Sequence, residues 1–365
     1  MKKIWRKWTA LVCALVMVLS AFSTAAFAAS EEDDLELSTN TLMQNYLNQN
    51  VPYPLTDISY AAMDKVFDLC NKLAGATEDW SDADGHEMLN VRYGERPVQT
   101  YDWNVPANLD KDKPVGVILF VHGGTWYAGS KENFTWAARR FAKHGYITAT
   151  LNYDLVSFGN PDMAKATGSK ENAYVPDMLD DINQCIADLN ARIRELGYRP
   201  SGLALAGESA GSHLAGMYAY SRAQDSAIPV KCLIGITFPV SWRQGTFNNY
   251  SSAECANYIN MISGASITGK QYRDHDPAIE PILHELSPVD YINEKTVPTL
   301  LGFAGKDTTI GTNQYQTIKP YLDKYHVPYD VVWWPNSNHA LYSDPGVLDN
   351  QFMPKALQYL SAYLK

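Results

Sequence analysis

Residues 203–220 of this 365-residue chain, LALAGESAGSHLAGMYAY, carry its clearest indication of a fold class. Its first four residues are typical of a buried strand, and the run from Ala210 onward has the length and apolar content of a buried helix. Between them lies Gly207-Glu208-Ser209-Ala210-Gly211, a G-x-S-x-G motif. At a strand-to-helix junction this motif predicts a nucleophile elbow, in which the glycines permit a strained turn that exposes the serine hydroxyl. Ser209 is therefore the candidate nucleophile.

Strand-like and helix-like segments alternate on both sides of this junction. Strands are predicted at residues 98–105, 115–121, 146–151, 203–206, 232–238, 299–303 and 329–334, and helices at residues 134–143, 175–196, 210–221, 314–325 and 354–364. This alternation predicts an α/β fold with a mostly parallel central sheet and helices on both faces. Residues 154–174 and 240–286 interrupt the alternation, and we expect long connections of this kind to form binding loops or a cap.

A second motif, His122-Gly123-Gly124-Thr125-Trp126, directly follows the apolar run at residues 115–121. An H-G-G loop after a buried strand can turn its backbone N–H groups toward a developing oxyanion. We assign Gly123 and Gly124 to this oxyanion hole, together with the N–H of Ala210. His122 precedes the nucleophile, whereas the partners of such a serine follow it in the order acid, histidine, so we expect His122 to stabilise the loop.

Asp307 and His339 fit the expected order. Asp307 comes just after the predicted strand at residues 299–303, and His339 follows the strand at 329–334 and the polar turn PNSN. An imidazole at this edge of the sheet would take the serine proton, and the acid would hold the imidazole in the required tautomer. The competing acids Asp290 and Glu285 do not directly follow a core strand. Surface or packing roles are expected for the remaining histidines, which are His86, His144, His213, His275, His284 and His326.

In combination, the HGG-x-W loop, the GESAG elbow, the GKD sequence at Asp307 and the NHA sequence at His339 resemble the α/β-hydrolase esterases close to hormone-sensitive lipase and to the bacterial feruloyl and acetyl esterases. The resemblance covers about residues 95–365. It implies the α/β-hydrolase fold, the triad and oxyanion hole assigned above, and no cofactor. Thr125 stands where lipase-like members usually have a third glycine, and HGG-x-W also resembles the loop of arylformamidases. The preference for ester or amide substrates therefore stays open.

The composition disfavours other classes of protein. Hydrophobic residues make up 46% of the chain, which supports a sizeable core, and the formal net charge of −10 disfavours nucleic-acid binding. The sequence contains no H-E-x-x-H, C-x-x-C, G-x-G-x-x-G or P-loop motif. We accordingly expect neither a metal site nor a nucleotide cofactor.

The first 28 residues have the layout of a secretory signal peptide: a basic start (MKKIWRKW), an apolar run at residues 9–22 and an A-x-A site ending at Ala28. Cleavage there would remove four basic residues and no acid, which changes the net charge from −10 to −14. The expected product is secreted or associated with the cell envelope, without a membrane anchor. We expect residues 29–90 to form an extension with a helix at 57–73, and residues 91–365 to form the catalytic domain, capped around 240–286.

The mature chain would keep four cysteines, Cys70, Cys185, Cys232 and Cys255. Export permits disulfides, and four cysteines allow three full pairings, but a chain of this length can also stabilise its core with all thiols free. The sequence does not choose between these states, nor does it determine the oligomeric state.

The leading functional interpretation is a secreted serine carboxylesterase for short-chain acyl or aryl esters, including esters of oligosaccharides. Its candidate substrate contacts are Trp126, Tyr127 and Trp242, with further aromatic side chains in the cap at Phe247, Tyr250, Tyr258 and Tyr272. Aromatic residues that fill a core under the cap are the competing explanation. The alternative functions are an amidase, an arylformamidase or an exopeptidase on the same fold. A non-catalytic binding protein is disfavoured because every triad residue is present.

Overall fold

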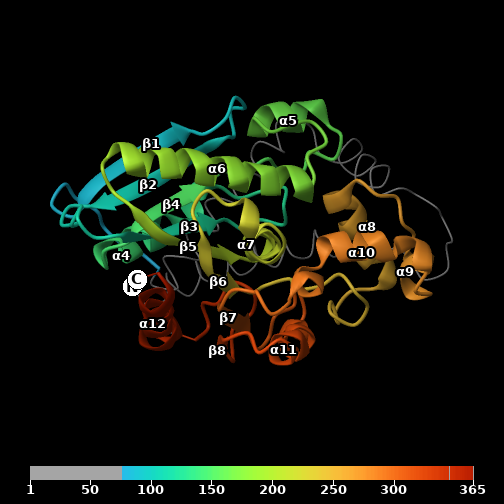
Figure 1. The fold of residues 1–365 in the computed structure, drawn as a ribbon. Helices are drawn as coiled ribbons and strands as arrows, with labels where there is room; N and C mark the ends of the chain where they lie inside the picture. Colours follow the sequence, from blue (N-terminus) through green and yellow to red (C-terminus); the bar gives the residue numbers. More distant parts are fainter. Residues whose placement is uncertain (1–75, 345, 365) are drawn as a thin grey trace, which may run out of the picture.

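The computed structural model describes residues 76–344 and 346–364, and within them a central sheet separates two layers of helices (Figure 1). The strands are β1 (Gly85–Arg92), β2 (Thr100–Pro106), β3 (Val115–Val121), β4 (Ile147–Leu151), β5 (Pro200–Glu208), β6 (Val230–Ile236), β7 (Thr299–Ala304) and β8 (Tyr329–Trp334). Their order in the sheet is β1-β2-β4-β3-β5-β6-β7-β8. β2 pairs antiparallel with β1 and β4, and all other pairs are parallel, which confirms the predicted sheet.

The helices flank and cap this sheet. They are α4 (Thr135–Lys143), α5 (Pro161–Thr167), α6 (Val175–Glu195), α7 (Ala210–Ser221), α8 (Ser252–Ser263), α9 (Gly269–Arg273), α10 (Glu280–Leu286), α11 (Gln314–Lys324) and α12 (Met353–Tyr363). A short 3₁₀ helix, η1 (Lys131–Phe134), precedes α4.

The two faces of β3 contact different helix layers. Successive side chains of a strand point to opposite faces. Val117 and Leu119 belong to the core that α6 and α7 cover, whereas Ile118 and Phe120 belong to the core that α4 and α12 cover. Because both faces are buried, all seven residues of β3 are buried, and the strand has the unbroken apolar sequence typical of the centre of a parallel sheet.

The sheet begins earlier than the sequence indicates. β1 starts at Gly85, ahead of residue 91, where the catalytic domain was expected to start. β1 is an antiparallel edge strand with mostly half-buried or exposed residues. It therefore lacks the apolar run that marks a central strand.

Both long connections, at residues 154–174 and 240–286, contain helices that were not predicted from the sequence. Within residues 240–286 the chain forms α8, α9 and α10, and within 154–174 it forms α5 (Figure 1). The side chain of Ser251 accepts a hydrogen bond from the N–H of Glu254, and the Glu254 carboxylate accepts one from the N–H of Ser251. This S-x-x-E capping box is the sequence signal that could have located the start of α8.

Several expectations concern residues that the structure does not describe: the signal peptide, the helix at 57–73 and Cys70. Cys185, Cys232 and Cys255 are buried free thiols. Of the helices described, none combines the length and hydropathy needed to cross a bilayer. Within residues 76–344 and 346–364, no three His, Cys, Asp or Glu side chains cluster in a way that could hold a metal ion.

Candidate active site

Ser209 lies at a sharp turn between β5 and α7. Its backbone has φ +54° and ψ −126°, a strained conformation for a residue with a side chain. The turn is this tight because the chain passes close to itself: a Cβ on Gly207 would lie 2.5 Å from the Gly211 carbonyl carbon, and one on Gly211 would lie 2.0 Å from the Val121 oxygen. The two glycines of the motif are therefore required by space, as expected for a nucleophile elbow.

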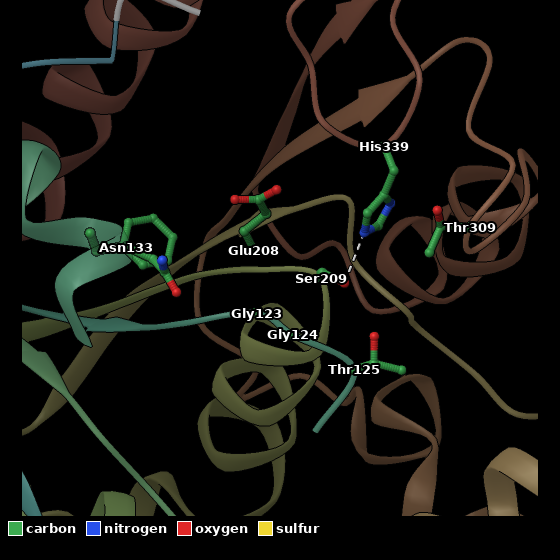
Figure 2. A pocket seen from close by; sticks show the side chains of 9 residues that line it. Gly123, Gly124, Thr125, Asn133, Glu208, Ser209, Thr309 and His339 are labelled. Atoms are coloured by element: carbon green, nitrogen blue, oxygen red, sulfur yellow. Dashed lines mark hydrogen bonds between the residues drawn. The ribbon is translucent and has the colours of Figure 1, made fainter. Parts of the chain in front are cut away.

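The topology of the sheet brings the predicted partners to this elbow. Loops that follow parallel strands emerge at the same edge of a sheet. His339, after β8, places Nε2 2.8 Å from the Ser209 Oγ (Figure 2). Its Nδ1 lies 2.8 Å from Oδ2 of Asp307, which follows β7. Since the carboxylate accepts the Nδ1 proton, Nε2 is left to accept the serine proton.

The surroundings of Asp307 favour its ionised form and hold it in place. Burial pushes the pKa of this carboxyl upward, but the His339 imidazole and the backbone N–H groups of Ile310 and Thr309 outweigh that effect and leave the pKa below its usual value. Those N–H groups donate to Oδ1 over 3.0 and 2.8 Å. Burial lowers the pKa of His339, yet the Asp307 charge and hydrogen bond raise it above its usual value. The pair thus favours the imidazolium that forms when serine loses its proton.

The candidate oxyanion loop lies against the elbow. A Cβ on Gly123 would be 3.2 Å from the Ser209 Cβ, so the backbone of the loop approaches the nucleophile closely. Three consecutive residues, Gly124, Thr125 and Trp126, have φ of +115°, +55° and +62°. Ala210 begins α7, where the first N–H groups have no acceptor within the helix. The loop backbone and the start of α7 therefore both lie beside Ser209, where an oxyanion would need backbone donors.

Two pockets meet at Ser209. The polar pocket is lined by Gly123, Gly124, Thr125, Asn133, Phe134, Glu208, Ser209, Thr309 and His339 (Figure 2). The aromatic pocket is lined by Thr125, Trp126, Ser209, Trp242, Phe247, Tyr250, Tyr258, Thr309 and Ile310. A bound ester could place one side of its carbonyl in each pocket.

The chain matches the family model BD-FAE, the bifunctional feruloyl/acetyl esterases, over residues 102–322, which is more than half of its length. It belongs to this family. Its α/β-hydrolase fold is shared with esterase B from Lactobacillus rhamnosis, with a TM-score of 0.60 and 19% identity over 86% of this chain and 97% of that one. A truncated carbohydrate esterase from gut microbiota also has a TM-score of 0.60, with 14% identity over 78% of this chain and 98% of that one.

Among curated proteins, kynurenine formamidase from Salmo salar is 29% identical to this BD-FAE member over 130 residues, which are 36% of this chain and 37% of the formamidase. A rice protein (Oryza sativa subsp. japonica) described as a probable isoprenylcysteine alpha-carbonyl methylesterase is 32% identical over 126 residues, 34% of this chain and 26% of that protein. The chain thus spans well under half the length of these curated relatives.

Neither competing acid of this BD-FAE member contacts His339. Asp290 pairs with Arg243, with Nη2 and Oδ2 2.8 Å apart, and Glu285 is exposed on α10. His122 has the structural role expected of it: Nδ1 lies 2.7 Å from the Gly123 oxygen, and the ring stacks on Tyr153. Burial lowers the pKa of His122 to about 4, so it is neutral at neutral pH.

His213 has the packing role predicted for it, and the structure identifies its partners. Its Nε2 lies 2.8 Å from the oxygen of Leu286 at the end of α10, and its Nδ1 accepts a hydrogen bond from Trp126 Nε1 over 3.3 Å. Burial lowers the pKa of His213 to about 4, which keeps the ring neutral with one donor and one acceptor nitrogen. His213 therefore links the oxyanion loop to the cap through α7. The only sequence signal is its position one turn after Ser209.

The aromatic substrate contacts predicted from sequence divide into two groups. Trp126 and Trp242 line the aromatic pocket, although they are only 4% and 1% exposed. Trp242 stacks on Phe247 with ring centroids 4.6 Å apart. Tyr127 packs on Phe158 and is not among the lining residues of either pocket. Packing therefore accounts for much of this aromatic cluster, and its outer surface forms the pocket wall.

Proposed function

We propose that this BD-FAE family member is a secreted serine carboxylesterase that hydrolyses short-chain acyl or aryl esters, including esters of carbohydrates. The observation that carries the proposal is the continuous hydrogen-bond chain from the Ser209 hydroxyl through His339 to Asp307, with both contacts at 2.8 Å. A hydroxyl becomes an effective nucleophile when an oriented imidazole can take its proton.

The reaction follows from this geometry. His339 Nε2 takes the proton as Ser209 Oγ attacks the ester carbonyl, and the negative charge on the carbonyl oxygen is stabilised by the N–H groups of Gly123, Gly124 and Ala210. His339 then protonates the leaving alcohol. In the second half, His339 removes a proton from water, which attacks the acyl-enzyme and releases the acid.

The pocket walls support the proposed substrate class. The aromatic pocket suits an apolar acyl or aryl group, because its walls are mainly aromatic rings. The polar pocket offers the side chains of Thr125, Asn133 and Glu208, which suit an alcohol that carries hydroxyl groups. The fold shared with a carbohydrate esterase agrees with this assignment.

A second candidate function is hydrolysis of an aryl formamide. The similarity to kynurenine formamidase and the HGG-x-W loop favour it. The same triad would attack an amide carbonyl, and His339 would protonate the leaving amine. Comparing kcat/KM for phenyl acetate and for formanilide separates the two functions: a higher value for formanilide would favour the formamidase.

The direct test of the proposal uses a fluorophosphonate probe, which labels activated serines. We expect labelling of the wild-type protein at Ser209, and Ser209→Ala should lose both labelling and turnover of 4-nitrophenyl acetate. Ser221→Ala, at the far end of α7, is the matched control and should keep both. Labelling that survives in Ser209→Ala would contradict the assignment of the nucleophile.

The proposed secretion is tested separately. If residues 1–28 are removed during export, N-terminal sequencing of protein from the culture medium of an expressing bacterium should begin at Ala29. Recovery only of intracellular protein with residues 1–28 attached would refute this part of the proposal.

A further inference from the structure

The side chain of Glu208 lies beside the nucleophile but neither gives nor takes a proton in the proposed reaction. Glu208 ends β5, and its half-buried carboxylate lines the polar pocket together with Asn133 and His339 (Figure 2). Among the described residues, none donates a hydrogen bond to this carboxylate, and no lysine or arginine pairs with it. Glu208 thus presents an unpaired acceptor to the space where a substrate must bind.

An unpaired carboxylate in a partly buried site is costly for the protein alone. Burial raises the pKa of Glu208; the His339 imidazole opposes this effect and the Asp307 charge adds to it. A buried or half-buried polar group without a partner in a functional cleft is explained when the ligand supplies the missing donor.

The charged side chains around the pocket are unfavourable for an anionic group on the substrate. None of the residues that line either pocket is a lysine or an arginine. Lys131 on the neighbouring η1 is engaged by Asp102, at 2.9 Å, and by Glu132. An anionic group on the substrate would therefore meet the Glu208 carboxylate with no lysine or arginine on the pocket wall to offset its charge.

We propose that Glu208 is a specificity-determining residue, whose carboxylate accepts hydrogen bonds from the hydroxyl groups of the alcohol part of the substrate and repels alcohol parts that carry a carboxylate. The inference rests on the proposed esterase function and narrows its substrates to neutral polyhydroxyl esters. A sugar hydroxyl donates to a carboxylate acceptor, whereas a second carboxylate offers no donor and brings a like charge.

Glu208 also affects the catalytic histidine. Its negative charge adds to that of Asp307 in raising the pKa of His339. The titratable groups that face Glu208 among the described residues are His339 and Asp307. Removal of the carboxylate should lower the pKa of His339, so the acid limb of the kcat/KM profile should move to lower pH, since the free enzyme needs a neutral imidazole.

The test compares Glu208→Gln with Glu195→Gln, which removes the same charge from an exposed position at the end of α6. The substrates are acetylated glucuronic acid and its methyl ester, which differ in one charge, and acetate release is measured for both. We expect wild type and Glu195→Gln to prefer the methyl ester. In Glu208→Gln the ratio of acetate release from the methyl ester to that from the acid should fall by roughly tenfold. The variant lacks the repulsion between the Glu208 carboxylate and the glucuronate carboxylate, which is a single charge pair at a partly solvated site. Glu208→Asp keeps the charge and should keep the preference.

The pH profile with 4-nitrophenyl acetate provides the second readout. Its acid limb should shift to lower pH in Glu208→Gln and not in Glu195→Gln. An unchanged preference in a folded, active Glu208→Gln, or an equal rate of the wild type on both sugars, would overturn the inference and leave the esterase function intact. Absence of acetate and nitrophenol release by the wild type would instead refute the proposed function.

Discussion

At the scale of single residues, Asp307 illustrates how the site combines charge with orientation. Its Oδ2 contacts His339 and its Oδ1 accepts two backbone hydrogen bonds. Both oxygens of this almost fully buried side chain therefore have a partner. The loop therefore holds the carboxylate in one orientation, and the carboxylate holds the imidazole.

Asp307→Asn should fold normally and lose on the order of 10⁴ in turnover, because an amide can bind the wrong tautomer of His339 and does not stabilise its charged form. The measurement is kcat with 4-nitrophenyl acetate together with a circular-dichroism check of folding. Asp290→Asn is the matched control, since Asp290 pairs with Arg243 on the cap side, and it should keep near wild-type turnover. Exchanged behaviour of the two variants would make Asp290 the acid.

At the scale of elements, the oxyanion loop depends on a contact with α7. Its consecutive residues with positive φ are strained, and strain of this kind persists only where the surroundings hold it. The Trp126–His213 hydrogen bond and the bond from the Val156 N–H to the Trp126 oxygen are two such restraints.

Trp126→Phe removes the indole donor and leaves the buried Nδ1 of His213 unpaired. We expect a loss of about 1–3 kcal/mol in the free energy of unfolding, measured by chemical denaturation. Because the loop loses a restraint, kcat should fall more than KM rises. Trp333→Phe, a half-buried tryptophan on β8, controls for the loss of ring size and should keep kcat. Equal kcat in both variants would show that the indole N–H does not restrain the loop.

The described cap helices expose no large, strongly exposed hydrophobic side chain. In the described residues the large hydrophobic side chains that are strongly exposed are Leu89 and Leu196, and neither lies in the cap. A lipase lid must instead expose a broad apolar face to a lipid interface. The described cap therefore covers a pocket and does not present a lipid-binding surface.

From this we predict that kcat/KM along a series of 4-nitrophenyl esters is highest between acetyl and butyryl, with no jump in rate when the substrate forms micelles. A deep acyl pocket would instead gain up to about 0.8 kcal/mol for each methylene that it buries. A maximum at octanoyl or longer, or interfacial activation, would contradict the short pocket.

Across the whole molecule, an ion cluster joins the loop between β1 and β2 to α6. Arg96 bonds Asp154 over 3.0 Å and Asp181 over 2.8 Å, and both carboxylates are fully buried. The single guanidinium of Arg96 thus forms ion pairs with two carboxylates. Burial and the neighbouring charge of Asp154 raise the pKa of Asp181 to about 6, although hydrogen bonds and Arg96 oppose the shift.

This cluster predicts how stability depends on pH. In the unfolded chain an aspartate titrates near pH 4, so between about pH 4 and pH 6 the folded state binds more protons at Asp181 than the unfolded state. Its contribution to the free energy of unfolding therefore falls as pH rises through this window. We expect the free energy of unfolding, measured by chemical denaturation at pH 4.5 and at pH 7, to fall less between these two pH values in Asp181→Asn than in the wild type. Asp225→Asn, an exposed control, should behave like the wild type, and equal falls in all three would contradict the prediction.

Local patterns in the sequence were enough to predict the fold class, the elbow and the three residues of the proposed triad. Each of these depends on local signals: a strand, a glycine-bounded turn and a helix around Ser209, and polar residues directly after the strands that precede Asp307 and His339. Because parallel strands end at one edge of a sheet, local position along the chain was enough to predict their meeting in space.

The surroundings of these residues could not be predicted from local patterns, because they depend on contacts between distant parts of the chain. The Trp126–His213 and His213–Leu286 contacts join residues 87 and 73 positions apart, and no local pattern specifies such pairs. β1 was missed because an exposed edge strand needs no apolar run, and the helices of the cap were missed because their packing, rather than a strong apolar period, stabilises them. Glu208 adjoins the nucleophile in sequence, yet its unpaired carboxylate is a property of the folded pocket, because the presence or absence of a partner depends on every element that the fold brings near it.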